Sequence, residues 1–336
     1  MNHGLVIGSV EIPGRVLIAP MTGVSDLPFR RAASRLGAAY VATEMVACAE
    51  LARGRPDVVR RAAVGEGLPL TVIQLVGRDP HMIAAGARMA EAAGAHLIDL
   101  NFGCPAKEVT GSLSGSALMR DLDLACRLID AAVSATSRPV TVKMRLGWDS
   151  ASHNAPELAA KAEGLGAAAV TVHGRTRQQF YTGTADWSAV ARVKDAVGIP
   201  VIVNGDIIDA ASARTALKQS RADAVMLGRG VYGQPWLAAS VDRALRGEAG
   251  SEDPVRGERL QLVIDHLRDS LQFYGDRLGL KIFRKHLGWY VEKAPWPGDP
   301  AARRAAKSRL CRMDDPRAVE LGLTELWREG VAAVAA

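Results

Sequence analysis

The sequence predicts an α/β protein in which a (β/α)8 TIM barrel is followed by a small all-α C-terminal domain. Three observations lead to this prediction. Eight short runs are rich in β-branched residues, segments with helical periodicity separate these runs, and the pattern changes after Tyr232. Strands that alternate with helices are typical of βα units, whose parallel strands are joined by crossover helices.

Each predicted strand ends in polar or glycine residues, where a loop would begin. The runs are residues 15–20, 39–45, 70–77, 96–101, 139–146, 168–174, 200–206 and 223–228. Between them, apolar residues recur at helical spacing, as in residues 80–93, 122–135, 157–165 and 210–218. Eight units in about 240 residues suit a closed barrel better than the alternative, an open doubly wound sheet of six or seven strands.

The last part of the chain has a different pattern. Residues 246–257 are polar and rich in glycine and charge, which is typical of a linker. Beyond them, apolar residues recur at helical spacing without any further strand pattern, at Leu260, Val263, Ile264, Leu267 and Leu271. We therefore expect residues 1–246 to form the barrel domain and residues 247–336 to form a helical domain.

The composition excludes several classes of protein. Of 336 residues 48% are hydrophobic and 23% are charged, which excludes disordered and fibrous chains. No run of about 18 apolar residues and no secretory signal pattern is present, so we expect no membrane association. The four cysteines lack paired spacing, which favours reduced thiols in a cytoplasmic protein without a metal site. A net charge of +6 permits a polyanionic partner, and no obligate protein partner is evident.

Polar residues lie near the ends of several predicted strands. In this fold the functional site lies at the carboxyl ends of the strands. Because side chains alternate along a strand, the aliphatic residues can face the outer helices while Gln74, Lys143, His173 and Asn204 point into the barrel. One polar residue at a strand end is most often structural, but four that converge favour a site.

The loops after the seventh and eighth strands predict a phosphate site. They contain Asn204, Gly205 and Asp206 in the first loop, and Gly228 and Arg229 in the second. Glycines let backbone N–H groups approach an anion, and barrels commonly bind phosphate here. Residues 228–233 also match the pattern GxGxxG. They follow the last strand instead of opening a nucleotide-binding unit, so we reject a dinucleotide-binding fingerprint.

The fourth loop places Cys104 between a glycine and a proline at the mouth of the barrel. Cys48 and Cys126 lie in predicted helical segments, where a lone cysteine is most often a packing residue. A thiol with the ordinary pKa of about 8.5 is mostly protonated at neutral pH and can act as a general acid. Cys104 is therefore the candidate proton donor.

These residues belong to motifs by which the chain resembles the tRNA-dihydrouridine synthases, specifically their bacterial DusB-like branch. The matching segments are residues 19–30, 101–107, 142–148, 173–177, 203–207, 228–230 and 284–286, followed by Trp289 and Tyr290. They occur in order over nearly the whole chain, and the set is far more specific than any one motif. Thr22 stands where alanine is common and Phe102 where methionine is common, but neither replaces a group that does chemistry.

The resemblance implies an FMN enzyme that reduces the C5=C6 bond of specific uridines, in the D-loop of tRNA, with NADPH or NADH. In that reaction Cys104 would protonate C5. The implied cofactor contacts are Pro20, Met21, Thr22, Gln74, Lys143, His173, Asn204, Gly205, Asp206, Gly228 and Arg229. The implied substrate contacts are Asn101, Arg145, Arg175 and Tyr181, with Arg284 and Lys285 of the helical domain on the tRNA backbone.

Two other functions are compatible with parts of this pattern. A barrel flavoprotein that reduces a small pyrimidine-like molecule would share the phosphate loops, but it would not need a basic helical domain, and tight tRNA binding would exclude it. A non-catalytic RNA-binding protein would not need Cys104 or Lys143, and a colourless protein unable to take up FMN would favour it.

Overall fold

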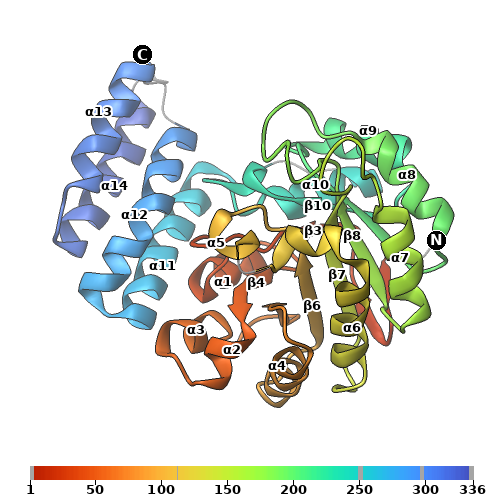
Figure 1. Cartoon of the computed structure of the whole chain (residues 1–336). Helices are drawn as coiled ribbons and strands as arrows, with labels where there is room; N and C mark the ends of the chain where they lie inside the picture. The colour runs from red at the N-terminus through yellow and green to blue at the C-terminus, as the bar shows by residue number, and fades with distance from the viewer. Residues whose placement is uncertain (1–3, 112, 249–252, 296–298, 333–336) are drawn as a thin grey trace.

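The computed structural model describes residues 4–111, 113–248, 253–295 and 299–332. Eight parallel strands form its centre (Figure 1). They are β3 (Val16–Ile18), β4 (Ala42–Ala47), β5 (Val72–Val76), β6 (Leu97–Phe102), β7 (Val140–Arg145), β8 (Ala169–His173), β9 (Val201–Asn204) and β10 (Ala224–Leu227). Neighbours pair in the order β3-β10-β9-β8-β7-β6-β5-β4, and a parallel bridge between Ile18 and Val41 closes the ring. The predicted barrel is confirmed, and the open-sheet alternative is wrong.

The predicted alternation of side chains along the strands is also confirmed. Ile73, Val142 and Val172 belong to the main hydrophobic core outside the barrel wall. Val72 and Ile202 belong to a second cluster inside the barrel. This register turns the polar residues of the same strands inward, toward the carboxyl-terminal end that we call the mouth.

Helices surround the barrel. They are α1 (Leu27–Arg35), α2 (Cys48–Ala52), α3 (Pro56–Arg61), α4 (Pro80–Ala92), α5 (Lys107–Thr110), α6 (Leu122–Val133), α7 (Ala155–Gly164), α8 (Trp187–Ala196), α9 (Ala210–Ser220) and α10 (Leu237–Arg246), with short 3-10 turns η1 (Gly115–Arg120) and η2 (Arg229–Val231). The side chains of Asp79, Asp121, Asp186 and Asp209 each accept a backbone N–H of the first turn of α4, α6, α8 and α9. Such N-caps fix where a helix begins.

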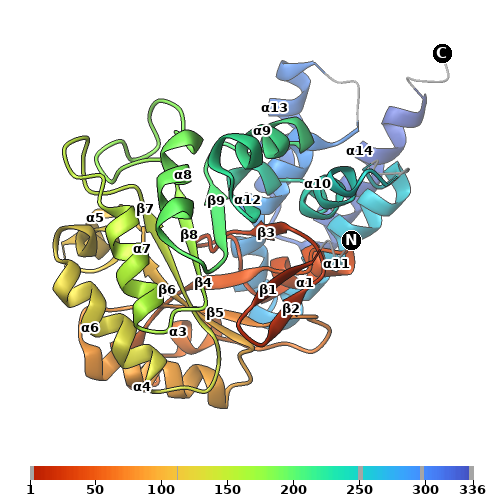
Figure 2. The same cartoon turned by 90° about the vertical axis from the view of Figure 1, so that its right-hand side faces the viewer.

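An N-terminal hairpin closes the end of the barrel opposite the mouth. It consists of β1 (Leu5–Ile7) and β2 (Val10–Ile12), which pair antiparallel (Figure 2). Leu5, Ile7 and Ile12 pack into the cluster inside the barrel. These two strands were not predicted from the sequence.

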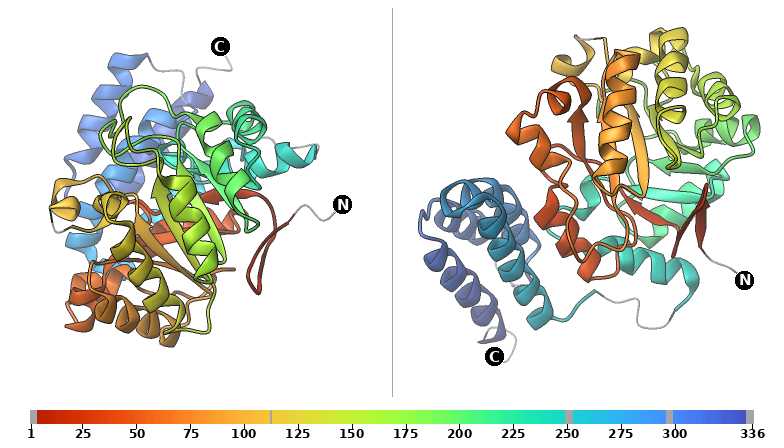
Figure 3. Two further views of the ribbon diagram at one scale, coloured as in Figure 1. Left: turned by 45° about the vertical axis from the view of Figure 1, so that its right-hand side comes forward. Right: turned by 90° about the horizontal axis from the view of Figure 1, so that it is seen from below.

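Four further helices follow the barrel: α11 (Arg256–Tyr274), α12 (Asp276–Lys293), α13 (Pro300–Cys311) and α14 (Pro316–Ala332). They share a hydrophobic core of their own that includes Leu267, Phe283 and Leu323. Figure 3 shows them beside the barrel, where α11 packs on α1. Part of the predicted linker, residues 249–252, lies outside the described residues, and the domain boundary at residue 246 stays a prediction. No helix within the described ranges combines the length and apolar composition that a membrane crossing requires.

Candidate active site at the barrel mouth

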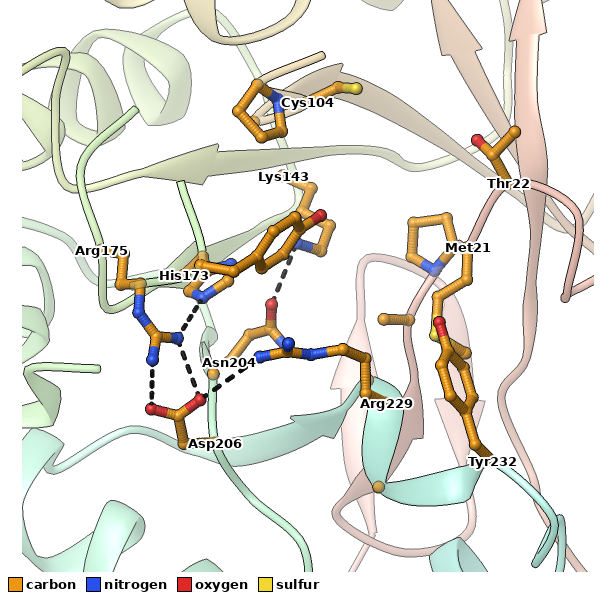
Figure 4. A pocket seen from close by; sticks show the side chains of 18 of the residues that line it. Met21, Thr22, Cys104, Lys143, His173, Arg175, Asn204, Asp206, Arg229 and Tyr232 are labelled. Carbon is orange, nitrogen blue, oxygen red and sulfur yellow. Dashed lines mark hydrogen bonds and ion pairs between the residues drawn. The ribbon is translucent and has the colours of Figure 1, made fainter. Parts of the chain in front are cut away.

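A cavity of about 1000 Å³ opens at the mouth (Figure 4). Most of the residues predicted from the sequence line it: Pro20, Met21, Thr22, Asn101, Cys104, Lys143, Arg145, His173, Arg175, Tyr181, Asn204, Gly205, Asp206, Gly228 and Arg229. These residues come from loops that are far apart in the sequence. The parallel barrel brings them together because all strands end at the same rim.

Three predicted site residues lie outside the lining of the cavity. Gln74 is fully buried below it, within the barrel. Arg284 forms an ion pair with Asp314 at 2.5 Å. The Nζ atom of Lys285 lies so close to Gly23 that a side chain at position 23 would collide with it. The roles proposed for these three residues stay predictions.

Lys143 and His173 lie side by side on neighbouring strands of the cavity floor. The Lys143 Nζ donates to Asn204 Oδ1 at 3.1 Å, and Asn204 Nδ2 donates to the Met226 carbonyl at 2.7 Å. Burial and the nearby charge of Arg145 lower the pKa of Lys143 to about 8. Burial together with Lys143 and other cations holds the pKa of His173 well below its usual range. The floor therefore presents one cation and one neutral imidazole near neutral pH.

The loop after β9 needs its glycine. Gly205 has φ +113°, and a Cβ atom there would lie 2.8 Å from both Ala185 Cβ and His173 Cδ2. The next residue, Asp206, also has a positive φ, +53°, which is strained for a residue with a side chain. Backbone strain of this kind costs free energy and persists where surrounding contacts hold it.

The carboxylate of Asp206 supplies those contacts. It accepts two hydrogen bonds from Arg175, at 2.9 and 2.6 Å, and one from the Ala185 N–H at 2.8 Å. Arg229 lies 3.8 Å away. Partial burial opposes ionisation, but the hydrogen bonds and charge of Arg175 leave the pKa of Asp206 below its ordinary value. The Asp206 carboxylate is thus paired with Arg175 and Arg229. Any contact between Asp206 itself and a phosphate would therefore come from its backbone.

Cys104 is held by its backbone while its thiol faces the cavity. Its N–H donates to Asn101 Oδ1 at 2.9 Å, and its carbonyl accepts from the Ser116 N–H and Oγ at 3.0 and 2.8 Å. Burial raises the pKa of the thiol above its ordinary value. At neutral pH the group is therefore a protonated thiol in a fixed place. Figure 4 shows it across the cavity from Asp206 and Arg229.

A buried arginine, Arg145, shapes one side of the cavity. Arg145 is 1% exposed and donates to the carbonyls of Gly103 and Phe180, both at 2.8 Å. Its guanidinium carbon lies 5.5 Å from the centre of the Tyr181 ring. Burial lowers the pKa of Arg145 to about 10, so the group remains charged at neutral pH. Phe180 and Tyr181 are each 45% exposed at the rim, in edge-to-face contact.

Helix α12 contributes a part of the cavity that was not predicted from the sequence. Trp289, Glu292 and Lys293 line it, and the Trp289 ring stacks on Tyr232 with centroids 3.9 Å apart and planes 14° apart. Gly233, at φ +70°, has no room for a side chain because the Trp289 carbonyl occupies that space. Trp289 was noted as part of a tail motif, but nothing in the sequence indicates that this helix reaches the mouth.

A second group of buried titratable residues lies where α1 meets α11 and α12. Asp26, His266 and His286 approach one another closely enough to suggest a metal site. Asp26 is already engaged, since its Oδ1 accepts the Phe29 N–H at 3.0 Å and its Oδ2 accepts the Tyr274 hydroxyl at 3.1 Å. We attribute the group to the junction between the barrel and the C-terminal helices.

The family model and two relatives similar in sequence are all named dihydrouridine synthases. The family model described as dihydrouridine synthase (Dus) matches residues 17–314. A protein of Rhodobacter capsulatus named probable tRNA-dihydrouridine synthase is 48% identical over 329 residues, which are 97% of this chain and 99% of that protein. The tRNA-dihydrouridine synthase B of Pseudomonas aeruginosa is 42% identical over 335 residues, 97% of this chain and 98% of that protein.

Solved structures with little sequence identity share the fold alone. A morphinone reductase mutant in complex with tetrahydroNAD has a TM-score of 0.52 at 16% identity, over 73% of this chain and 90% of that chain. A 2-naphthoyl-CoA reductase complex has a TM-score of 0.56 at 11% identity, over 74% of this chain and 52% of that chain. Both likenesses agree with the barrel described above.

Proposed function

The chain belongs to the dihydrouridine synthase family, and from this premise we propose that it is a flavin-dependent tRNA-dihydrouridine synthase. It would reduce the C5=C6 bond of specific D-loop uridines, with FMN as cofactor and NADPH or NADH as reductant. The observation that carries the proposal is the cavity at the mouth. There, glycine loops suited to a phosphate, the cationic Lys143 and the protonated thiol of Cys104 face one space.

The residues at the mouth fit an FMN. Gly228 has nothing within 4 Å of the position a Cβ would take, so its backbone is open to an anion. Gly205 and Arg229 stand beside it in the cavity lining and would hold the phosphate. Lys143, whose ammonium donates to Asn204, would address the ring system, near Pro20, Met21 and Thr22. When bound, FMN supplies the hydride for the uracil ring.

The protein's own contribution is a proton and a fixed electrostatic environment. Reduction of C5=C6 adds a hydride at C6 and a proton at C5. The Cys104 thiol holds that proton, because burial keeps it in the neutral form. Arg145 is a buried cation and Lys143 is a partly buried one, and both favour the negative charge that develops on the uracil before C5 is protonated.

The size of the cavity supports an RNA substrate over a small free pyrimidine. About 1000 Å³ lies at the upper end of the range for small-molecule pockets, and the cavity continues to α12. A uridine inside folded RNA must be turned out of its stack to enter. Exposed Lys281 and Lys285 of α12 would hold the tRNA backbone, which makes residues 247–336 the proposed tRNA-binding domain. The four free cysteines support the expected cytoplasmic location.

Dihydrouridine mapping tests this proposal. tRNA from a strain that lacks the gene should lose dihydrouridine at defined D-loop positions, and the wild-type gene should restore it while a Cys104→Ala gene should not. Release of the bound flavin by heat, followed by mass analysis, identifies the cofactor. Unchanged dihydrouridine in the deletion strain, together with a purified protein that takes up no flavin, would favour a non-catalytic RNA-binding protein.

A further inference from the structure

A buried carboxylate that none of the roles above uses lies beneath the cavity. Asp99 on β6 is 2% exposed. Thr141 Oγ1 donates to its Oδ1 at 2.7 Å, and Gln74 Nε2 donates to its Oδ2 at 2.6 Å. Both carboxylate oxygens are held from neighbouring strands, so the group cannot reorient. A buried charge of this kind is costly unless it is paired and hydrogen-bonded.

The carboxylate fixes the orientation of two side-chain amides in succession. A carboxylate only accepts hydrogen bonds, so Gln74 must turn its NH2 group toward Asp99 and its oxygen away. That oxygen accepts from Asn101 Nδ2 at 2.7 Å. Asn101 Oδ1 then faces the loop and accepts the N–H groups of Gly103 and Cys104 at 3.2 and 2.9 Å. An unbroken chain of hydrogen bonds thus joins Asp99 to the loop that carries the thiol.

Asp99 also acts on Lys143 through its charge. In the register of β6 and β7, Asp99 pairs with Thr141 and Asn101 pairs with Lys143, so the carboxylate lies one layer below the ammonium. Burial raises the pKa of Asp99 to about 6, and the attraction of Lys143 opposes that rise. In turn, Asp99 opposes the lowering of the Lys143 pKa by burial and Arg145.

We propose that Asp99 is a positioning residue of this active site, which holds the Cys104 loop through Gln74 and Asn101 and keeps Lys143 protonated. The inference deepens the proposed function, since only that function makes Cys104 a proton donor and Lys143 a cofactor contact. The hydrogen-bond chain itself is independent of the reaction.

Titratable groups from several elements lie near Asp99 and Lys143. Those facing Lys143 are Arg145 on β7, His173 on β8, Cys104 in the loop after β6 and Asp99, and Tyr40 lies beside Asp99. Because Lys143 supplies a positive charge to the flavin ring only while it is protonated, flavin affinity should fall as pH rises through about 8.

The variant Asp99→Asn removes the charge and can keep both hydrogen bonds, because an amide can accept from Gln74 and donate to Thr141. We expect the fall in flavin affinity to move to lower pH by about one unit, which is a loss of about fivefold at the wild-type midpoint and approaches tenfold at higher pH. The matched control is Asp130→Asn, an exposed carboxylate on α6. Coincident pH profiles of wild type and Asp99→Asn would overturn the proposal that the charge of Asp99 keeps Lys143 protonated.

The variant Gln74→Met breaks the hydrogen-bond chain and leaves the charge. In protein stripped of flavin, alkylation of Cys104 by iodoacetamide, resolved by peptide mass, should become several-fold faster, with Cys126 as internal reference. Asp99→Asn should label like wild type. Equal labelling of Cys104 in wild type and Gln74→Met would overturn the relay. A protein that takes up no flavin would refute the proposed function, while labelling would still decide the relay.

Hydrogen exchange of the unmodified chain tests the relay if Gln74→Met does not fold. Because Asn101 accepts the Cys104 N–H, this amide should exchange at least about tenfold more slowly than an unprotected loop amide. Exchange of the Cys104 amide at the unprotected rate would contradict the relay without any variant.

Discussion

Cys104 carries the chemical step in this account, because it supplies a buried, neutral thiol at a fixed place in the cavity. Cys104→Ala should still bind flavin, and the reductant should still bleach it, because neither step needs the thiol. Dihydrouridine formation should fall by roughly 10²–10⁴-fold, the usual range for a lost general acid. Steady-state assays on unmodified tRNA measure this. Cys126→Ala on α6 is the control, and a comparable loss there would show a general structural effect.

Lys143 and Arg229 are the cations that the account assigns to the cofactor. Arg229→Ala should weaken flavin binding by about 1–3 kcal/mol, the value of a charge-assisted hydrogen bond. Its side chain is largely exposed, so the loss should be smaller in high salt. Titration of flavin-free protein gives the affinity, and Arg192→Ala on the outer face of α8 is the control. Equal flavin affinities for wild type and Arg229→Ala would show that Arg229 does not contact the flavin.

At the residue scale, alternation along the strands was sufficient to predict that Gln74, Lys143, His173 and Asn204 point inward. It could not predict which of them reach the cavity. Gln74 is sealed below it, because its amide is consumed by Asp99 and Asn101. Which hydrogen-bond partners a buried side chain finds depends on neighbouring strands, and a single sequence does not contain that information.

Among the elements, every predicted strand is present, because β-branched runs followed by polar or glycine residues are distinctive. The hairpin of β1 and β2 was missed, since each strand has only three residues and little alternation to detect. Strand β4 begins three residues after the predicted run does. There the backbone makes only the isolated bridge at Val41 that closes the barrel.

Helix α12 is the element whose contribution is least evident from the sequence, and Trp289 tests it. Trp289→Ala removes the stack on Tyr232, worth about 0.5–1.5 kcal/mol beyond the buried area. We expect a lower free energy of unfolding and weaker flavin binding, because Tyr232 follows η2, which contains the proposed phosphate contact Arg229. Urea unfolding and flavin titration measure the two effects. Trp289→Phe can still stack on Tyr232 and should recover most of the free energy of unfolding and most of the flavin affinity. Failure to recover them would show that stacking is not the cause.

For the whole molecule, the account places the tRNA on the barrel mouth and on α12 together. The double variant Lys281→Glu with Lys285→Glu should weaken tRNA binding strongly and make the negative slope of log affinity against log salt shallower by about 2 or more. Flavin content should not change. Filter binding over a salt series measures this, with Arg192→Glu as the control. A slope equal to that of wild type would exclude α12 from the tRNA surface.

The arrangement of barrel and C-terminal helices could not be predicted from one sequence. Periodicity indicated helices after residue 257, but their packing depends on contacts between distant segments. Phe29 of α1 stacks on His286 of α12 with ring centroids 5.4 Å apart, and Tyr274 of α11 donates to Asp26. These contacts hold α12 against the barrel, and residues of α12 line the cavity at the mouth.

A single turnover tests most directly whether this protein reduces uridine in tRNA. Purified protein is reduced with NADPH in the absence of oxygen, freed of excess reductant and mixed with tRNA that lacks modifications. We expect flavin absorbance to return as one dihydrouridine forms per flavin oxidised, and the same protein mixed with free uridine to remain reduced. Prompt reoxidation by free uridine with none by tRNA would contradict the account and identify a small-molecule reductase.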